Sequence, residues 1–566
     1  MRPDQTTTPS RYQQQVLDFV KHGSGHGIVK ATAGSGKTST LVLVARELEP
    51  TLLATGERAC FLAFNRATAA ELRSRLPDSV EATTLHALGR SILVGAQTTA
   101  SGAKPEAAKY RLLAETVTSE RGAPRSATIS GYLGRLAQVA RLELTPAEDL
   151  DAVANLAERY RLEAPVTGAD VENLHACLEP LLSRGAQEAL EGSFDFTDMV
   201  YVPVLHELPP PRYAFICVDE AQDLSALALS FVMRLLEHGT RALFVGDPRQ
   251  AIYAFAGADS RAMARIAERT KSTELPLSVS YRCPIRHIAL ARRYAPEMEP
   301  KGASPLGTVR LISSDRLVQD VAPGDLIIAR TNQDLVGIAL QLAARGLSTR
   351  VLGTDLAGRA AELADRLFED GDLTDAQERI SASAAAETSN LERDLICDLR
   401  LPSALQGSAE RHAALELALK TGPANVLQAL DHLFAGADER APPIVLSSIH
   451  RAKGREAERV YLLDVDTLAA APTRSAEEDA SEENVLFVAL TRAKRELILV
   501  ESEVGAAARR LDAETRKEDL PRRWDDVLRF ALRMNRAARD SPQTEVRRII
   551  RTWQRTLSTK LREASW

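Results

Sequence analysis

The sequence lacks the features that identify secreted, membrane-spanning and disulfide-stabilised proteins. Its five cysteines are scattered without a CxxC pair, which indicates reduced thiols and a cytoplasmic location. No apolar run approaches membrane-spanning length, and the N-terminal segment MRPDQTTTPSRYQQQ is too polar for a signal peptide, so we expect no membrane association. The chain also has no excess of positive charge, because its net charge is −6. A basic groove on an acidic body would still allow nucleic-acid binding.

What is present is the composition of an ordinary globular protein. Apolar residues make up 45% and charged residues 26% of the 566 positions. At roughly 100–200 residues per domain, the chain should hold about three to five domains. Its length allows a large buried core that needs neither disulfides nor structural metals.

A glycine-rich loop near the N-terminus has the pattern of a phosphate-binding loop. In GIVKATAGSGKTSTLVLVAREL, an apolar strand (27–29) leads through small residues into an apolar-periodic helix (39–48). Ala31 stands where the pattern has its first glycine. Glycines let backbone N–H groups close around phosphate oxygens, Lys37 adds positive charge, and the Thr38 hydroxyl can ligate Mg²⁺. We therefore assign nucleotide binding to Ala33, Gly34, Ser35, Gly36, Lys37, Thr38 and Ser39.

Two adjacent acids end a second apolar strand in FICVDEAQDLS (215–225). Neighbouring carboxylates repel each other, so they are expected where a cation or a proton transfer offsets the cost. Asp219 would hold Mg²⁺ together with Thr38, and Glu220 would polarise a water molecule against the γ-phosphate of ATP. A strand-end turn or a helix cap is the simpler interpretation, but the glycine loop favours the metal site. The pair predicts an ATPase.

Further motifs bear on the kind of ATPase. In LFVGDPRQAIYAFAGAD (243–259), Gln250 could sense the γ-phosphate, while Tyr253 and Phe255 could stack on unpaired bases or pack beneath the loop. Arg282 and Arg492 lie next to apolar segments. They could neutralise charge that builds on the γ-phosphate, although an arginine in such a context is usually a surface ion pair.

The order of the motifs resembles the UvrD/Rep group of superfamily 1 DNA helicases. The matching segments are DEAQD, GDPRQAIY, SYR, SIHRAKGRE and VALTRAK. PSRYQQQVLDFV (9–20) is similar to the adenine-reading Q motif of that group, and FLAFNRATAAEL (61–72) and TTLHALG (83–89) to its two early DNA-contact motifs. Together they run from about residue 9 to 497. The resemblance implies an α/β fold of two RecA-like domains with ATP and Mg²⁺ in the cleft between them.

The resemblance also implies a role for each matching residue. Gln13 and Tyr281 would contact the adenine, and Glu456 would lie near the nucleotide. Glu220 would be the catalytic base and Gln250 the coupling residue, with Arg282 and Arg492 as arginine fingers. Single-stranded DNA would be contacted by Phe64, Thr84, His86, Tyr253, Phe255, Ser448 and His450. Two positions depart from the group: Ala256 stands where many relatives have arginine, and Arg455 where leucine is usual.

The predicted domains follow the positions of the motifs. The first RecA-like domain comprises 1–94 and 191–272, and the second 273–352 and 441–500. Helical inserts called 1B and 2B would occupy 95–190 and 353–440. The second insert is roughly half the length expected for the group.

Two further segments each allow a functional interpretation and a simpler structural one. Asp195 and Asp198 resemble a further acidic pair, but helix capping is favoured. The arginine-rich tail (501–566) could bind nucleic acid or a protein partner, although a solvated helix packed on the body is favoured.

Three functions remain. The first is an ATP-dependent helicase that moves 3′→5′ on single-stranded DNA and acts at junctions between single-stranded and duplex DNA. The second is a translocase or protein-stripping subunit of a repair, phage or defence complex, which the short second insert and Ala256 favour. The third is a small-molecule P-loop kinase, against which the aromatic loop and the paired arginines argue.

Overall fold

The protein is described by a computed structural model that divides into two compact units. The first unit is Met1–Tyr281 with Glu297–Glu299, and the second is Arg282–Pro296 with Pro300–Trp566. The structure describes residues 9–97, 104–121, 126–160, 162–166, 168–252, 261–330, 333–353, 355–368, 373, 375–394, 401–421, 426–435, 442–465 and 476–502.

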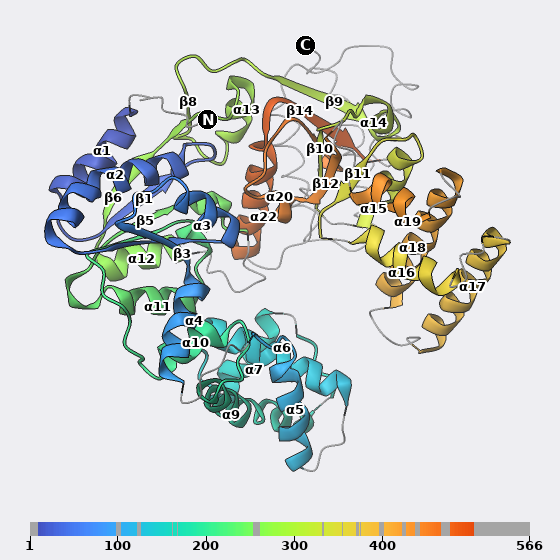
Figure 1. The fold of residues 1–566 in the computed structure, drawn as a ribbon, viewed down its shortest axis with the longest axis horizontal. Coiled ribbons are helices and arrows are strands. Elements are labelled where there is room, and N and C mark those ends of the chain that lie inside the picture. Colours follow the sequence, from blue (N-terminus) through green and yellow to red (C-terminus); the bar gives the residue numbers. More distant parts are fainter. Residues whose placement is uncertain are drawn as a thin grey trace. The chain divides into compact units, whose positions relative to one another are not determined.

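A six-stranded parallel sheet forms the centre of the first unit (Figure 1). Its strand order is β3-β2-β4-β5-β1-β6. The strands are β1 (Gly27–Ala31), β2 (Ala59–Ala63), β3 (Val80–Thr84), β4 (Phe215–Val218), β5 (Arg241–Gly246) and β6 (Thr273–Leu277). β2 and β4 are buried along their whole length, as expected for strands covered on both faces.

Helices cover both faces of this sheet, and each face has its own apolar core. The helices are α1 (Arg11–His22), α2 (Lys37–Thr55), α3 (Arg66–Arg73), α4 (Leu85–Ala96), α10 (Asp198–Leu205), α11 (Ala226–Leu235) and α12 (Ala262–Thr270). Ser10 and Gln13 form a capping box that starts α1. Short 3₁₀ turns follow two of the strands: η1 (Ala221–Asp223) follows β4 and η3 (Pro248–Gln250) follows β5.

Between α4 and α10 the described chain is helical and has a core of its own. These helices are α5 (Lys109–Glu120), α6 (Ala127–Glu143), α7 (Leu150–Arg159), α8 (Ala169–His175) and α9 (Leu178–Glu191). The exact bounds proposed for this insert from the sequence stay a prediction.

The second unit contains another six-stranded parallel sheet, of order β11-β12-β10-β13-β14-β9. Its strands are β9 (Thr308–Ser313), β10 (Leu326–Ala329), β11 (Thr349–Val351), β12 (Ile444–Ser448), β13 (Ala457–Leu462) and β14 (Ala493–Glu501). β7 (Val279–Ser280) and β8 (Glu299–Pro300) form a separate short pair. The two parallel sheets with flanking helices confirm the predicted α/β class.

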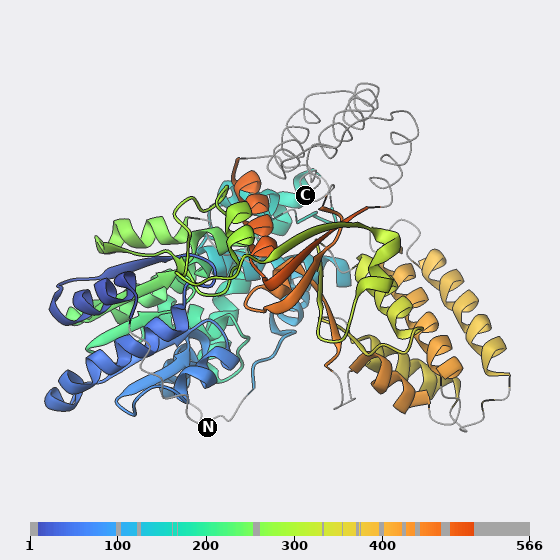
Figure 2. The ribbon, with the colours of Figure 1, turned by 90° about the horizontal axis from the view of Figure 1, so that it is seen from above.

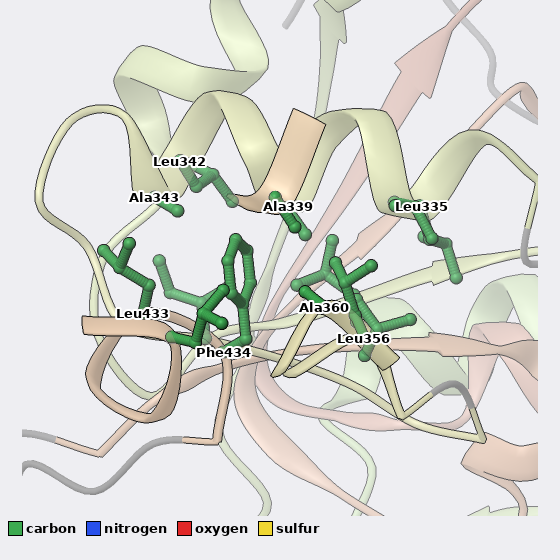
Figure 3. Close-up of a cluster of buried hydrophobic side chains, with 14 of the residues drawn as sticks. Leu335, Ala339, Leu342, Ala343, Leu356, Ala360, Leu433 and Phe434 are labelled. Carbon is green, nitrogen blue, oxygen red and sulfur yellow. The ribbon is translucent and has the colours of Figure 1, made fainter. Parts of the chain in front are cut away.

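The helices of the predicted second insert share one apolar core with this sheet. Figure 3 shows Leu335, Ala339, Leu342 and Ala343 of α15 facing Leu356, Ala360, Leu433 and Phe434. The helices gather on one side of the sheet in both ribbon views (Figures 1 and 2). Helices of this unit are α13 (Ile285–Ala291), α14 (Ser314–Asp320), α15 (Gln333–Ala343), α16 (Leu356–Leu367), α17 (Ala376–Asp394), α18 (Leu401–Thr421), α19 (Val426–Leu430), the π-helix η5 (Asp431–Ala435), α20 (Ile449–Ala452) and α22 (Ala476–Leu490).

Candidate functional site

The loop after β1 is shaped by two glycines with left-handed backbone. Gly34 has φ of 72° and Gly36 has φ of 80°, conformations that favour glycine. Gly36 is the N-cap of α2, so Lys37 and Thr38 open the helix where backbone N–H groups have no intrahelical partner. Ser35 is buried, and among the described residues its hydroxyl has no hydrogen-bond partner. This loop is built to receive an anion.

The acids that end β4 lie against this loop. Lys37 Nζ donates to Glu220 Oε2 at 2.8 Å, and both side chains are mostly buried. Gln222 Nε2 donates to the same oxygen at 2.6 Å. Burial opposes the charge on Lys37, but Glu220, Asp219 and Asp247 outweigh it and raise the pKa of Lys37. The lysine is therefore a permanent cation at the loop.

Asp219 is buried beside a second carboxylate. Burial and the charge of Glu220 raise the pKa of Asp219 to about 7, against an ordinary value of 3.8. Its Oδ1 accepts the backbone N–H of Glu220 at 2.9 Å. Binding of a cation strongly stabilises the ionised form of such a carboxyl group, because the cation offsets both the cost of burial and the repulsion by the second carboxylate.

Glu220 has a strained backbone, because its φ of 52° places a non-glycine residue in the left-handed region. Such a conformation costs of order 1–3 kcal/mol and persists where the surrounding structure imposes it. Here the turn η1 follows at once, and the Asp223 N–H donates to the Glu220 carbonyl at 2.9 Å. From this turn the Glu220 side chain reaches Lys37.

A chain of hydrogen bonds connects this site to the end of β5. Gln222 Oε1 accepts the backbone N–H of Asp247 at 3.0 Å, and Gln250 Nε2 donates to Asp247 Oδ2 at 2.6 Å. Gln222, Asp247 and Gln250 are all buried. Burial raises the pKa of Asp247, although Lys37 opposes this. Gln250 thus connects to Glu220 through two buried residues, Gln222 and Asp247, neither of which was assigned a role from the sequence.

Gln13 and Tyr281, the predicted adenine contacts, lie beside the glycine loop. Gln13 Nε2 donates to Thr40 Oγ1 at 3.2 Å, and Tyr281 Oη donates to Gln13 Oε1 at 3.4 Å. The backbone N–H of Tyr281 donates to the Gly34 carbonyl at 2.8 Å. Tyr281 is 43% exposed, so its ring surface is available to a ligand.

These residues fit ATP and Mg²⁺. Three features suit a polyphosphate: the glycine loop, the positive charge of Lys37, and the Ser35 hydroxyl, which has no hydrogen-bond partner among the described residues. Thr38 and Asp219 would hold Mg²⁺ through side-chain oxygens, the ligand type that this ion prefers. Among the described residues, no group of three or more His, Cys, Asp or Glu side chains forms a metal site without a nucleotide.

The second unit presents a cationic site around Glu456. Arg282 Nε donates to Glu456 Oε2 at 2.5 Å, and Lys494 pairs with the other carboxylate oxygen. Although burial opposes it, Lys494 and Arg282 lower the pKa of Glu456. Lys494 was not assigned from the sequence, although it follows the VALTRA run directly.

Arg492 is buried at the start of β14. It donates to the carbonyl of Val488 at 2.7 Å, to Thr491 Oγ1 at 2.9 Å and to the carbonyl of Arg455 at 3.4 Å. These acceptors are uncharged oxygens. Through these hydrogen bonds Arg492 connects α22 to the loop that carries Arg455.

Ser448 and His450 lie at the carboxyl end of β12. Burial lowers the pKa of His450 to about 4, with help from Arg330 and Lys453. Arg330, which follows β10, approaches His450 Nδ1 at 3.4 Å and pairs with Glu482 through two hydrogen bonds of 3.1 and 2.6 Å. His450 is therefore neutral near pH 7.

The predicted DNA contacts Phe64, Thr84 and His86 lie at the ends of β2 and β3, and β2 is the neighbour of β4. Phe64 is 48% exposed. Thr84 Oγ1 accepts the Ala87 N–H at 3.2 Å and so caps α4. His86 stacks on Phe196, with ring centroids 4.0 Å apart, and burial lowers the pKa of His86 to about 4. Phe196 was missed because its segment was interpreted as a cap.

Three predictions fall partly or wholly outside the described residues. They concern Tyr253, Phe255 and the tail 501–566. Of the remaining residues of the loop, Ala33 is buried and Ser39 is exposed. Within the described part of the chain, no helix is long and apolar enough to cross a membrane.

The two parallel sheets and the glycine loop define the class of RecA-like P-loop proteins. Residues 12–271 match the UvrD/REP helicase N-terminal domain, and residues 443–500 match the UvrD-like helicase C-terminal domain. The chain belongs to the UvrD/REP helicase family, which confirms the resemblance.

Two similar proteins extend over most of this chain. The ATP-dependent DNA helicase UvrD2 of Mycobacterium tuberculosis is 26% identical over 559 residues, covering 83% of this chain and 76% of that protein. F-box DNA helicase protein 1 of Schizosaccharomyces pombe is 24% identical over 518 residues. The match covers 83% of this chain and 55% of the yeast protein, so this chain spans about half the length of that relative.

Proposed function

We propose that the protein is an ATP-dependent DNA helicase and translocase that moves 3′→5′ on single-stranded DNA. The observation that carries the proposal is the common position of two sets of residues in the first unit. The first set contains the predicted nucleotide contacts, which come after β1, β4 and β5: Lys37, Glu220 and Gln250. The second set contains two predicted DNA contacts: Phe64 follows β2, and Thr84 is the last residue of β3. All these strands are parallel neighbours, so their carboxyl ends lie at one edge of one sheet.

The chemistry begins with an exchange of partners at Lys37. In the structure Lys37 neutralises Glu220. When ATP and Mg²⁺ are bound they supply the electrophilic phosphorus and its charge neutralisation. Lys37 then turns to the phosphate oxygens, and Glu220 is released to accept a proton from water. The ion pair thus keeps the base inactive until substrate is present.

The proposal assigns the arginine-finger residues to the second unit. Arg282 and Arg492 stabilise the charge that develops in the transition state, and Glu456 holds Arg282 ready. Gln250, linked to Glu220 through Gln222 and Asp247, couples the nucleotide state to the loop that carries Tyr253 and Phe255. Ser448 and His450 contribute DNA contacts from the second unit.

The polarity is tested by displacement of streptavidin from oligonucleotides biotinylated at one end. We expect ATP-dependent displacement from the 5′ end and none from the 3′ end, because a 3′→5′ motor runs toward the 5′ end. The opposite preference would contradict the assigned direction. The Glu220→Gln variant is the control and should displace from neither end.

A translocase with little unwinding is the second candidate. It is favoured by the packing of α16, α18 and α19, which share the core of the second sheet and do not form a separate core among the described residues. A strand-separation assay on 3′-tailed duplexes distinguishes the two candidates. Streptavidin displacement without strand separation would select the translocase.

A further inference from the structure

A buried cluster of charges connects α5 and α6 to the chain that enters α10. It consists of Lys109, Tyr110, Arg141, Asp195 and Asp198, which we call the buried charge cluster. Arg141 is 1% and Asp198 is 0% exposed. Two cations therefore face two carboxylates in the interior of the first unit.

Each carboxylate oxygen in the cluster has a partner. Asp198 Oδ1 accepts from Tyr110 Oη at 2.8 Å and from Arg141 at 2.7 Å, and Asp198 Oδ2 accepts from Lys109 at 2.7 Å. Arg141 also donates to both oxygens of Asp195, at 2.8 and 2.7 Å. The Arg141 guanidinium lies 3.6 Å from the centre of the Tyr110 ring.

Overall stability is a poor explanation for such a cluster. The cost of removing buried charges from water often equals their attraction, so apolar residues of similar size would serve as well. What ionic groups add is a fixed geometry, since removal of one partner leaves another charge unpaired. The question is therefore what the cluster holds in place.

It holds the turn that carries Phe196. The Asp195 N–H donates to Asp198 Oδ2 at 3.0 Å, and the Asp198 N–H donates to Asp195 Oδ1 at 2.8 Å. These two bonds close the turn around Phe196, which is 52% exposed and stacks on His86. The two residues flanking this turn are thus the two carboxylates of the cluster.

α4, the helix that carries His86, packs against α10, which begins at this turn. At Gly89 the helices approach so closely that a Cβ atom would clash with the carbonyl oxygen of Met199. The Phe196–His86 stack therefore rests on one rigid helix pair whose α10 end is held by the cluster.

We propose that the buried charge cluster is a positioning device that sets the ring of His86 through Phe196, and so controls the grip of the first unit on single-stranded DNA. The proposal rests on the proposed function, in which His86 contacts DNA. Arg141, Lys109 and Asp195 are then positioning residues that reach DNA only through the stack.

The experiment is a double-mutant cycle between Asp195→Asn and Phe196→Leu, read by single-strand affinity. In the wild-type background we expect Asp195→Asn to weaken binding of a fluorescent oligothymidine about fivefold. In the Phe196→Leu background the same change should have no further effect, because the stack through which it acts is gone. Equal effects in both backgrounds would overturn the proposal.

The control is Tyr132→Phe, which removes a buried hydrogen bond of 2.7 Å to His175 from the same helix as Arg141. It should leave DNA affinity unchanged. If Asp195→Asn does not fold, Tyr110→Phe replaces it, since it removes only the hydroxyl bond to Asp198 and should act in the same direction.

A second readout does not need DNA. In protein labelled with ¹³C at histidine Cε1, the His86 signal is identified by its loss in His86→Gln. We expect it to move in both Phe196→Leu and Asp195→Asn but not in Tyr132→Phe. A stationary signal in Asp195→Asn would overturn the positioning role. Absence of any DNA binding by the wild type would overturn the proposed function, while the His86 signal still decides the positioning.

Discussion

The two sheets of this protein have the same architecture, but different charged residues surround them. The first ends in a glycine loop with one lysine and three buried or half-buried acids, Asp219, Glu220 and Asp247. At the carboxyl end of β10 in the second sheet, Arg330 pairs with Glu482. Glu456 and Arg492 instead directly precede β13 and β14, and Glu456 pairs with Arg282 and Lys494. The segment LIIARTNQDLV, which contains β10 and the residues after it, has no glycine. A parallel sheet fixes where side chains are presented, and the residue types presented there set the chemistry that each unit can carry out.

The largest effects should arise at the edge of the first sheet. Glu220→Gln is expected to lower ATP turnover by 10²–10⁴-fold, because the proton acceptor is lost, while ATP and DNA still bind. Lys37→Ala should lose both nucleotide affinity and turnover, because Lys37 meets the phosphates before and during the reaction. Steady-state ATPase rates and nucleotide titrations check both. A Glu220→Gln protein with a nearly normal rate would show that Glu220 is not the base.

Changes to the two arginines of the second unit should reduce ATP turnover but not ATP affinity. Arg282→Ala and Arg492→Ala are each expected to slow hydrolysis about 10²–10³-fold, since each removes a donor that acts in the transition state. Lys494→Ala is the matched control, because it removes the other partner of Glu456 and has no assigned role at the phosphate. If ATP affinity falls as much as turnover, the two arginines contribute to ATP binding and do not act only in the transition state.

The coupling between nucleotide and DNA should give an intermediate effect. Phe255→Ala is expected to weaken single-strand affinity roughly tenfold, since stacking on a base contributes ~1–3 kcal/mol. The basal ATPase rate should be nearly unchanged and its stimulation by DNA reduced. Fluorescence anisotropy and thermal unfolding are measured on the same sample. A lower melting temperature with normal DNA affinity would show that Phe255 packs beneath its loop.

The acids of the first edge should also make stability depend on pH. Asp219, with a pKa of about 7, keeps its proton in the folded protein between about pH 4 and 7, where the unfolded chain has lost it. Its contribution to stability therefore falls as pH rises through this window. Asp219→Asn should gain roughly 1–3 kcal/mol relative to the wild type between pH 4.5 and 7.5. Thermal unfolding without nucleotide checks this, and a difference independent of pH would contradict the raised pKa.

The sequence predicted the fold class and the positions where chemistry was to be expected. Apolar strands that end in GSGKT, DEAQD or GDPRQ identify the carboxyl edge of a parallel sheet from residue types and spacing alone. The contacts between these motifs were not predictable. Gln222 and Asp247 meet only because β4 and β5 are neighbours, and the left-handed backbone of Glu220 has no signal in its residue type.

Long-range ionic contacts were the least predictable part. The carboxylates of Asp195 and Asp198 each accept the backbone N–H of the other residue across their turn. The N-cap of α10 is Thr197, without a side-chain cap, so the favoured capping interpretation does not account for the two acids. Their partners Lys109 and Arg141 come from helices more than fifty residues away, as the separations of 89 and 57 positions from Asp198 show. Periodicity identifies a helix but not which of its polar residues turns inward.

The most direct test of the proposed function is the ATPase rate with and without single-stranded DNA. If the first edge hydrolyses ATP and the aromatic loop couples it to DNA, an oligothymidine should raise turnover about tenfold or more, in the range of ordinary coupling energies. Glu220→Gln should abolish both the basal and the stimulated rate. An ATPase rate that does not change on addition of DNA would contradict the account and favour a small-molecule P-loop kinase.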